Sequence, residues 1–413
     1  MKVTLVTAYF QPEISPITHL YADLAADLAH YGAEVTVVTG QPDRGLDEET
    51  WRAYLDRREE TTPEGYRILR VGGKGREGHK LLRRGWRLLT QTGVLERAAR
   101  RTGADVYLLG SMPPMLGNVG ARLAKGQKAR TVYILQDIFP DTLVRMGRFR
   151  EKHPVIRLAR AMEKRAYAGN SHFVTLSGDM KKNLVAKGVA PEKITVIPNW
   201  ADTDEVHPLD REANKLFEEL GLDRSAFYAL YAGVLGKLQD PDVLLDAAKL
   251  LLPEKGITLL ILGGGAMEQH VRRRMESEHL VNVKLLPLQP PERVSEVYSL
   301  GNVALVPLRK GVTQCAMPSK TWTAMAAGVP VIAGAEPGSD WAEVIGRSGG
   351  GTCVPPEDGQ ALAEAIRAAY AARETLPETG RWGRAYLEKE WTRAKATEAY
   401  YHVCTGEGEQ EHV

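Results

Sequence analysis

The sequence has few cysteines, almost no excess of charge and no long apolar run. Its three cysteines, Cys315, Cys353 and Cys404, are too few and too widely spaced for a disulfide framework or a zinc site. The 54 lysines and arginines nearly balance the 52 aspartates and glutamates, so the composition does not point to nucleic acid as a partner. A run of about eighteen apolar residues, which a membrane-spanning helix needs, does not occur.

The first ten residues, MKVTLVTAYF, carry one charge and are otherwise mostly apolar. This stretch is too short for a signal peptide with a cleavage site, and it predicts a first β-strand. Together with the sparse cysteines, it predicts a cytoplasmic protein. The length of 413 residues predicts two domains rather than one.

Apolar strand patterns alternate with helix patterns along the chain, which predicts parallel sheets covered by helices on both faces. In the first half, strands are expected at 2–8, 34–39, 66–71, 105–109, 131–135, 172–176 and 194–197. In the second half, they are expected at 228–232, 258–262, 283–286, 303–307, 329–333 and 351–354. The predicted fold class is α/β, with two Rossmann-like doubly wound domains that face each other across a cleft.

The polar stretch after Pro198-Asn199-Trp200 divides the two halves. We expect a first domain over 1–202, a second over 203–385 and, over 386–413, a C-terminal helix that packs back on the first domain. The helical pattern itself runs from Arg381 to Cys404. Ligands of such sheets bind beyond the carboxyl ends of the strands, so the expected site is the cleft between the domains.

Three loops of the second domain follow predicted strands and carry residues suited to a diphosphate. They are Gly233-Val-Leu-Gly236-Lys237, Gly263-Gly264-Gly265 and Met317-Pro318-Ser319-Lys320. Glycine lets a backbone approach a ligand closely, and lysine contacts phosphate as a point charge. Each loop taken alone is equally consistent with a solvated lysine, a tight turn or an ordinary helix start. Their convergence on one rim of one sheet favours the diphosphate.

The corresponding loops of the first domain carry carboxylates and hydroxyls. Asp137 follows a strand directly, and it is either a general base for a hydroxyl nucleophile or a residue that caps a helix or holds a loop. Glu13, Ser15 and Ser177 lie on the same predicted rim. The sequence contains no metalloprotease, serine-hydrolase or P-loop motif and no cluster with metal-ligand spacing, so neither a metal nor a cofactor is expected.

Two basic amphipathic segments lie in the first half. Lys74–Arg101 holds nine lysines and arginines, and Arg145–Arg165 holds eight. Each is either a solvated helix face over a core stripe or a docking surface for anionic lipid. Two such segments in one half of a nearly neutral chain favour lipid, so we expect a peripheral protein on the inner face of the cell membrane.

Together, these motifs resemble the GT-B-fold retaining glycosyltransferases of family four. More narrowly, they resemble the bacterial branch that builds O-antigen, colanic-acid and capsule repeats, which includes N-acetyl-L-fucosamine transferases. The resemblance covers nearly the whole chain. It is carried by VTAYFQPEISPITHLYADLAADLAHYGAEVTVVTGQP, VIPNWAD, YAGVLGK, ILGGGAME, MPSKTWTAMAAGVPVIA and EVIGRSGGGTCVPPED.

The resemblance implies retaining transfer of a hexosyl or N-acetylhexosaminyl group from a nucleotide-diphosphate donor, with a UDP-sugar favoured. The acceptor would be a glycan or a polyprenyl-diphosphate-linked sugar. Catalytic roles are implied for Asp137, Lys237 and Lys320. The implied donor site comprises Gly233, Gly236, Lys237, Gly263, Gly264, Cys315, Met317, Pro318, Ser319, Lys320 and Thr323. The implied acceptor side comprises Glu13, Ser15, Asp137 and Ser177.

The chain departs from the family at two places. Where the family often has two glutamates eight positions apart, the second of which contacts the ribose, this chain has Cys315 and Thr323. The first-domain loop is usually rich in glycine, whereas here it reads PEISP.

Two other functions stay open. One is a nucleotide-sugar 2-epimerase of the same fold, and the other is a non-enzymatic two-lobed protein that binds a sugar or a nucleotide.

Overall fold

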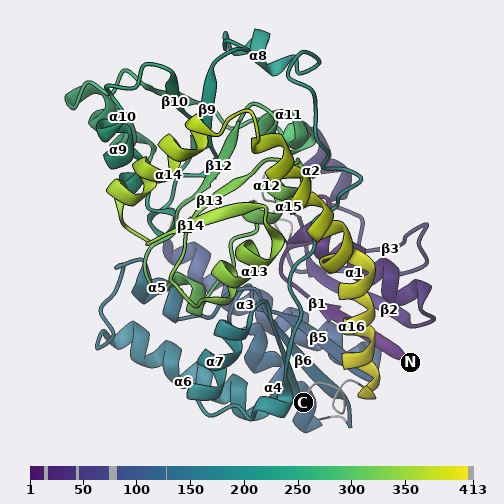
Figure 1. The fold of residues 1–413 in the computed structure, drawn as a ribbon. Coiled ribbons are helices and arrows are strands. Elements are labelled where there is room, and N and C mark those ends of the chain that lie inside the picture. The colour runs from purple at the N-terminus through teal and green to yellow at the C-terminus, as the bar shows by residue number, and fades with distance from the viewer. Residues whose placement is uncertain (14–16, 43–45, 74–80, 127, 408–413) are drawn as a thin grey trace. The chain divides into compact units, whose positions relative to one another are not determined.

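The computed structural model describes the chain except for residues 14–16, 43–45, 74–80, 127 and 408–413. The chain forms two compact units, each drawn in Figure 1 as a sheet with helices around it. Unit 1 comprises residues 1–199 and 393–413, and unit 2 comprises residues 200–392. The two α/β domains expected from the sequence are thus confirmed, and the chain passes between the units at 199/200 and 392/393.

Within the described residues, unit 1 is built on an eight-stranded sheet in the order β3-β4-β2-β1-β5-β6-β7-β8. Neighbouring strands are parallel except β3 and β4, which are antiparallel. The sequence did not predict β3, because three mostly exposed residues show no apolar pattern. The strands are β1 (Lys2–Val6), β2 (Glu34–Gly40), β3 (Glu59–Thr61), β4 (Arg67–Val71), β5 (Val106–Gly110), β6 (Arg130–Leu135), β7 (His172–Thr175) and β8 (Ile194–Val196).

Helices cover both faces of this sheet. They are α1 (Thr18–His30), α2 (Glu48–Tyr54), α3 (Leu81–Thr102), α4 (Leu116–Gly126), α5 (Asp141–Arg145), α6 (Pro154–Gly169), α7 (Gly178–Ala186) and α16 (Arg393–Thr405), with a 3₁₀ turn at Pro191–Lys193. Figure 1 shows α16, in yellow, alongside α1. The Arg393 guanidinium donates to the carboxylates of Asp23 and Asp27 at 2.8 and 2.6 Å. The C-terminal helix is therefore an integral part of unit 1.

The single helix predicted from Arg381 to Cys404 is wrong. Helix α15 (Leu376–Glu390) ends before Trp391, and α16 begins at Arg393. The Trp391 ring lies 4.0 Å, centroid to centroid, from the ring of Trp322. The two rings are tilted by 41°, and this contact packs the end of α15 against α12 within unit 2. Trp391 itself has left the helical conformation, with φ −122° and ψ 45°, which the helical pattern did not predict.

Within the described residues, unit 2 has a six-stranded, fully parallel sheet in the order β11-β10-β9-β12-β13-β14. The strands are β9 (Phe227–Val234), β10 (Ile257–Gly264), β11 (Val283–Leu286), β12 (Val303–Val306), β13 (Val331–Gly334) and β14 (Gly351–Val354). The helices are α8 (Leu216–Glu219), α9 (Pro241–Leu250), α10 (Glu268–Ser277), α11 (Val294–Tyr298), α12 (Lys320–Ala326), α13 (Asp340–Ser348), α14 (Gly359–Ala371) and α15, with 3₁₀ turns at Lys237–Gln239, Pro291–Arg293 and Val312–Gln314.

Alternate residues of β9 enter two separate apolar clusters. Tyr228 and Leu230 pack with residues of α12 and α13 on one face, whereas Phe227 and Ala229 pack with residues of α9 and α14 on the other. Because both faces are buried, the strand is almost continuously apolar, as the sequence indicated.

Each sheet has one point where the strand order reverses. In unit 1 it lies between β1 and β5, and in unit 2 between β9 and β12. Ligands of open α/β sheets bind beyond the carboxyl ends of the strands at such a point. The loops after these four strands are therefore the first places to look for a site.

Candidate functional site

In unit 2, the glycines at the carboxyl ends of β9 and β10 lie side by side, and the loops that follow them begin here. Gly233 is the register partner of Gly263, and Val234 is the partner of Gly264. The backbone N–H of Leu235 donates to the Gly264 carbonyl at 2.9 Å, which ties the two loops together. The structure thus brings together the predicted donor residues Gly233, Gly263 and Gly264 at the carboxyl ends of β9 and β10, next to the point between β9 and β12 where the strand order reverses.

Lys320, the first residue of α12, lies across this glycine pair. Its Nζ donates to the Tyr231 hydroxyl at 2.8 Å and lies 4.2 Å from the centre of the Tyr231 ring. A Cβ on Gly233 would lie 2.5 Å from Lys320 Cε, so only glycine leaves room for the lysine side chain. Burial lowers the pKa of Lys320 to about 7. In the described part of the chain no carboxylate pairs with this amine.

Tyr231 is a site residue that the sequence analysis missed. Its hydroxyl accepts from Lys320 and donates to the Val234 carbonyl at 2.6 Å, so it links the lysine to the loop after β9. The tyrosine is almost fully buried, and burial raises the pKa of its phenol. A tyrosine near the end of a buried strand looks like an ordinary core residue, so no sequence signal could have identified it.

The remaining residues of the predicted donor site take up different positions. Lys237 begins the 3₁₀ turn after Gly236 and is exposed to solvent. The Thr323 hydroxyl donates to the Ser319 carbonyl at 3.3 Å, and the Ser319 side chain makes no cap hydrogen bond. Cys315 is buried, with its thiol donating to the carbonyl of the residue three positions earlier. Met317 and Pro318 are half-buried.

Glu336, in the loop after β13, is a second residue that the sequence analysis missed. Its carboxylate accepts from the backbone N–H of Gly311 and from the Thr313 hydroxyl, the latter at 3.0 Å. It therefore fixes the segment that leads from β12 to Lys320. The sequence shows an acidic residue in the loop after a predicted strand, but it does not show that Gly311 and Thr313 are its partners, because only the fold brings them together.

In unit 1, Asp137 lies just beyond β6 and is paired with a serine from the loop after β5. The Ser111 hydroxyl donates to Asp137 Oδ1 at 3.2 Å and accepts from the backbone N–H of Gln136 at 3.1 Å. Burial raises the pKa of Asp137 to about 6, and the serine hydrogen bond opposes this only in part. With a pKa of about 6, Asp137 is half protonated near pH 6 and mostly ionised at pH 7.

Tyr21 of α1 adds a third polar group to this cluster and was also missed. Its hydroxyl is buried and has no hydrogen-bond partner among the described residues. A Cβ on Gly110, at the end of β5, would lie 2.7 Å from that hydroxyl. Burial and the nearby charge of Asp137 raise the pKa of Tyr21. The cluster therefore lies beside the reversal point between β1 and β5.

The other predicted acceptor residues hold loops. Glu13 is buried, and its Oε2 accepts from the backbone N–H of Phe10 at 3.3 Å. The Ser177 hydroxyl accepts from the backbone N–H of Met180 at 3.2 Å and so caps α7. Ser15 lies outside the described residues.

The two basic segments are described to different extents. Residues 74–80 of Lys74–Arg101 lie outside the described part, and most of the rest forms α3. In Arg145–Arg165, α6 exposes Val155 and Leu158, 48% and 66% accessible. The same segment also exposes basic residues before and along α6, among them Arg148, Arg150, Lys152, Arg157, Lys164 and Arg165. This surface, the α6 face, combines exposed apolar and cationic groups. None of the described helices has the length and apolarity to cross a bilayer.

Comparison with known proteins gives one family description for each half of the chain. Residues 18–200 match "Glycosyl transferase 4-like domain", and residues 212–385 match "Glycosyl transferases group 1". The putative colanic acid biosynthesis glycosyl transferase WcaI of Escherichia coli (strain K12) is 27% identical over 397 residues, which cover 94% of this chain and 96% of WcaI.

Two solved structures have a similar fold over nearly the whole chain. Sucrose-phosphate synthase of Thermosynechococcus elongatus has a TM-score of 0.77 at 18% identity, and the alignment covers 98% of both chains. Anabaena Alr3699/HepE, solved in complex with UDP and glucose, has a TM-score of 0.73 at 15% identity, with 98% of this chain and 100% of that chain covered. At this identity the similarity establishes the fold.

Proposed function

The chain is a glycosyltransferase of the GT-B fold, formed by a glycosyl transferase 4-like domain and a glycosyl transferases group 1 domain, and from this premise we propose the reaction that it catalyses. It transfers a hexosyl or N-acetylhexosaminyl group from a UDP-sugar to a glycan or a polyprenyl-diphosphate-linked acceptor in surface polysaccharide biosynthesis. The anomeric configuration is retained. The similarity to WcaI supports the pathway, and the HepE complex with UDP and glucose supports the donor.

The observation that carries the donor assignment is the position of Lys320 across Gly233. The amine has no carboxylate partner in the described residues, and its hydrogen bond to Tyr231 uses one of its three donors. Two N–H donors remain for phosphate oxygens. A diphosphate close to this amine favours its charged form, so donor binding raises the lysine pKa from about 7.

In this proposal, Lys320 and Lys237 stabilise the departing nucleoside diphosphate. The bond between the anomeric carbon and the diphosphate oxygen breaks, and a bond from that carbon to the acceptor oxygen forms. Negative charge grows on the leaving oxygen, and cations already in place lower the energy of that charge. The glycines after β9 and β10 let the backbone come close to the phosphates.

Asp137 is the proposed partner of the acceptor hydroxyl. With a pKa of about 6, a large fraction of its carboxylate is ionised at neutral pH and ready to take a proton. The donor phosphate is the alternative base in a retaining transfer, and Asp137 then anchors the acceptor by a hydrogen bond. Ser111 orients the carboxylate in both cases. Glu13 and Ser177 shape the neighbouring loops, which fits their contacts with backbone N–H groups.

The α6 face is the proposed contact with the inner face of the cell membrane. Exposed Val155 and Leu158 supply apolar area, and the exposed lysines and arginines of the same segment are attracted to anionic headgroups. Such contact brings the enzyme to an acceptor that is itself held in the membrane. A polyprenyl-linked acceptor would give this face a role.

The test of the proposed function is the thermal stability of the purified protein with UDP, GDP, ADP, CDP and dTDP. A ligand that binds only the native state stabilises it by about 2.7 kcal/mol at a hundred times its Kd. We expect a rise in Tm with UDP, and its loss in Lys320→Ala. Lys310→Ala is the matched control, because Lys310 is exposed and lies outside the glycine loops. No rise with any nucleotide would contradict the donor assignment.

Turnover separates the two other functions that the sequence left open. A nucleotide-sugar 2-epimerase forms an epimer from the donor alone, in the absence of any acceptor. A binding protein shows the rise in Tm but releases no nucleoside diphosphate with any acceptor. The proposed transferase instead releases UDP only when a suitable acceptor is present, apart from slow hydrolysis.

A further inference from the structure

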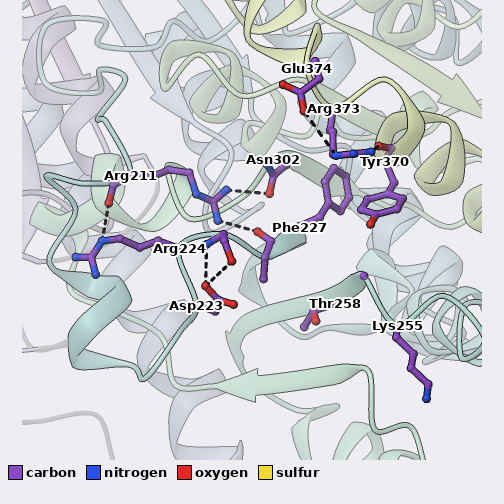
Figure 2. Close-up of a pocket in the computed structure, with 13 residues that line it drawn as sticks. Arg211, Asp223, Arg224, Phe227, Lys255, Thr258, Asn302, Tyr370, Arg373 and Glu374 are labelled. Carbon is purple, nitrogen blue, oxygen red and sulfur yellow. Dashed lines mark hydrogen bonds and ion pairs between the residues drawn. The ribbon is translucent and has the colours of Figure 1, made fainter.

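Unit 2 contains a pocket of about 500 Å³ at the amino ends of β9 and β10 (Figure 2). Its lining includes Phe227 and Thr258, the first residue of β9 and the second of β10, whereas the glycines of the proposed donor site lie at the carboxyl ends. Strand β9 has eight residues and rises about 3.3 Å per residue, so the pocket lies about 23 Å from the loops that follow those ends. The proposed donor site does not account for it.

Arg211 lies in the wall of this pocket, and among the described residues no carboxylate forms an ion pair with it. Its guanidinium donates to Asn302 Oδ1 and to the Ala226 carbonyl, each at 2.9 Å, and lies over the Phe217 ring at 4.7 Å. Its Nε is buried and has no hydrogen-bond partner among the described residues. Burial lowers the pKa of Arg211, and the nearby charges of Asp223 and Glu212 oppose this shift only in part.

The charges around the pocket are not balanced. Four cationic side chains line it, and only two carboxylates do. Of these, Asp223 already accepts from the Ser225 N–H and hydroxyl, both at 2.8 Å, and Glu374 is largely exposed beside Arg373. Arg224 pairs with Glu212 at 4.0 Å, and Arg373 pairs with Glu374 at 3.8 Å. Arg211 and Lys255 have no such partner among the described residues, so the pocket keeps an excess of positive charge.

The uncharged groups of the pocket suit a ligand that has both a ring and hydroxyls. The rings of Phe227 and Tyr370 lie edge to face, with centroids 5.3 Å apart, and Figure 2 shows them side by side. Among the described residues, the hydroxyls of Thr258 and Tyr370 have no hydrogen-bond partner. Gly256 leaves room for the Tyr370 phenol, which a Cβ at that position would contact.

We propose that this pocket binds a phosphate monoester of sugar size, at a second site that is separate from the donor loops. A phosphate dianion takes hydrogen bonds from several cations at once, and arginine and lysine are the usual partners. The sugar ring lies against the partly exposed Tyr370, which packs on the buried Phe227, and its hydroxyls pair with Thr258 and Tyr370. The volume lies within the range of about 300–1,000 Å³ that is usual for small-ligand sites. A sugar phosphate that reports on metabolite supply is the class of ligand that fits.

The test measures the Tm of the full chain as a function of glucose 6-phosphate in the millimolar range. Glucose and inorganic phosphate serve as reference ligands. The pocket variant is Lys255→Ala with Arg373→Ala, which removes two exposed cations and leaves the wall around Arg211 intact. Arg273→Ala with Arg347→Ala removes two exposed cations elsewhere in unit 2 and is the matched control. Lys237→Ala reports on binding to the donor loops.

We expect glucose 6-phosphate to raise Tm in the wild type, the matched control and Lys237→Ala, and its affinity to fall at least tenfold in the pocket variant. Glucose alone should have no effect, and inorganic phosphate should bind more weakly. An unchanged affinity in the pocket variant, loss of binding in Lys237→Ala, or no rise in the wild type would overturn the proposal. Binding to vesicles that contain phosphatidic acid, without any response to glucose 6-phosphate, would also overturn the proposal and would indicate that the pocket binds a lipid headgroup instead.

Discussion

The two sheets place opposite kinds of ionisable group near the points where their strand order reverses. In unit 2, Lys320 follows β12, and in unit 1, Asp137 follows β6 and pairs with Ser111 from the loop after β5. Burial lowers the lysine pKa to about 7 and raises the aspartate pKa to about 6. Each group is held by a hydroxyl rather than by an opposite charge, Tyr231 in one case and Ser111 in the other.

The difference between the two groups matches the two halves of the proposed transfer. A buried amine near neutrality gains its proton when an anion arrives, which suits the diphosphate of the donor. A buried carboxyl with a pKa near 6 loses its proton close to neutrality, which suits an acceptor hydroxyl. The same physical cause, burial without a countercharge, thus prepares one unit for anions and the other for hydroxyls.

Lys320→Ala should have the largest effect. It removes a charge-assisted contact with the leaving group, and the loss of one such stabilising group costs about 100-fold or more in rate. The fold should persist, because the amine has no ion pair in the described structure. Release of UDP measures the rate, and chemical denaturation measures stability. Transfer within a few-fold of wild type would remove Lys320 from the mechanism.

Gly233→Ala should have the next largest effect. The added methyl group would lie 2.5 Å from Lys320 Cε, so the lysine must leave its position, and KM for the donor should rise about tenfold or more, as expected for a displaced charge contact. Gly233 also has a φ of +127°, so the variant loses about 1–3 kcal/mol of stability through backbone strain.

Gly221→Ala is the control that isolates the contact with Lys320. Gly221 has a φ of +60° and nothing within 4 Å of an added Cβ, so this variant carries backbone strain alone. It should lose stability without a change in KM. An equal rise in KM in both variants would mean that strain, rather than the displaced lysine, weakens donor binding.

Asp137→Asn should lower kcat/KM about tenfold, because the amide keeps the shape but takes no proton. The same change should raise stability above pH 6. The folded pKa of about 6 exceeds the unfolded value of 3.8, so the stability that the protonated carboxyl provides is lost as pH rises through 6. We expect the variant to gain about 1–3 kcal/mol at pH 8 and nothing near pH 4. Glu192→Gln, an exposed carboxylate of unit 1, should change neither quantity.

The pH dependence of kcat/KM should show the smallest effect, a change of several-fold. The rate rises as Asp137 ionises through about pH 6 and falls as free Lys320 loses its proton through about pH 7, which gives a narrow bell. In Asp137→Asn the acid limb should disappear while the alkaline limb stays. An acid limb that persists in this variant would assign proton transfer to another group, such as the donor phosphate.

The fold was largely predictable from the sequence because both sheets are buried on both faces. Strands such as Phe227–Val234 are almost continuously apolar, and glycines or polar residues mark their ends. Two features escaped prediction. β3 pairs through its backbone while most of its side chains stay exposed, and the helix breaks at Trp391, whose ring contacts Trp322, a residue far away in sequence.

The candidate site was predictable only where the chemistry lies next to a strand end. Gly233, Gly263 and Lys320 follow predicted strands, and the structure brings them together. Tyr231 and Tyr21 could not be found, because each resembles a core tyrosine until the fold brings an amine or a carboxyl next to it. The sequence also placed Cys315 in the donor site. In the structure its thiol is buried and donates to the Val312 carbonyl, a contact that the position of Cys315 in the motif does not predict.

The separation of α16 from α15 has a consequence for synthesis of the protein. Unit 2 is one continuous segment, whereas unit 1 needs residues from both ends of the chain. On the ribosome, unit 2 is therefore complete before unit 1 is. Until Arg393 emerges, the carboxylates of Asp23 and Asp27 lack its guanidinium, and the buried residues of α16, such as Tyr400, are missing from the core. A prematurely terminated chain thus contains all residues of unit 2 but lacks part of the core of unit 1, so unit 1 can complete its fold only once translation has reached the last helix.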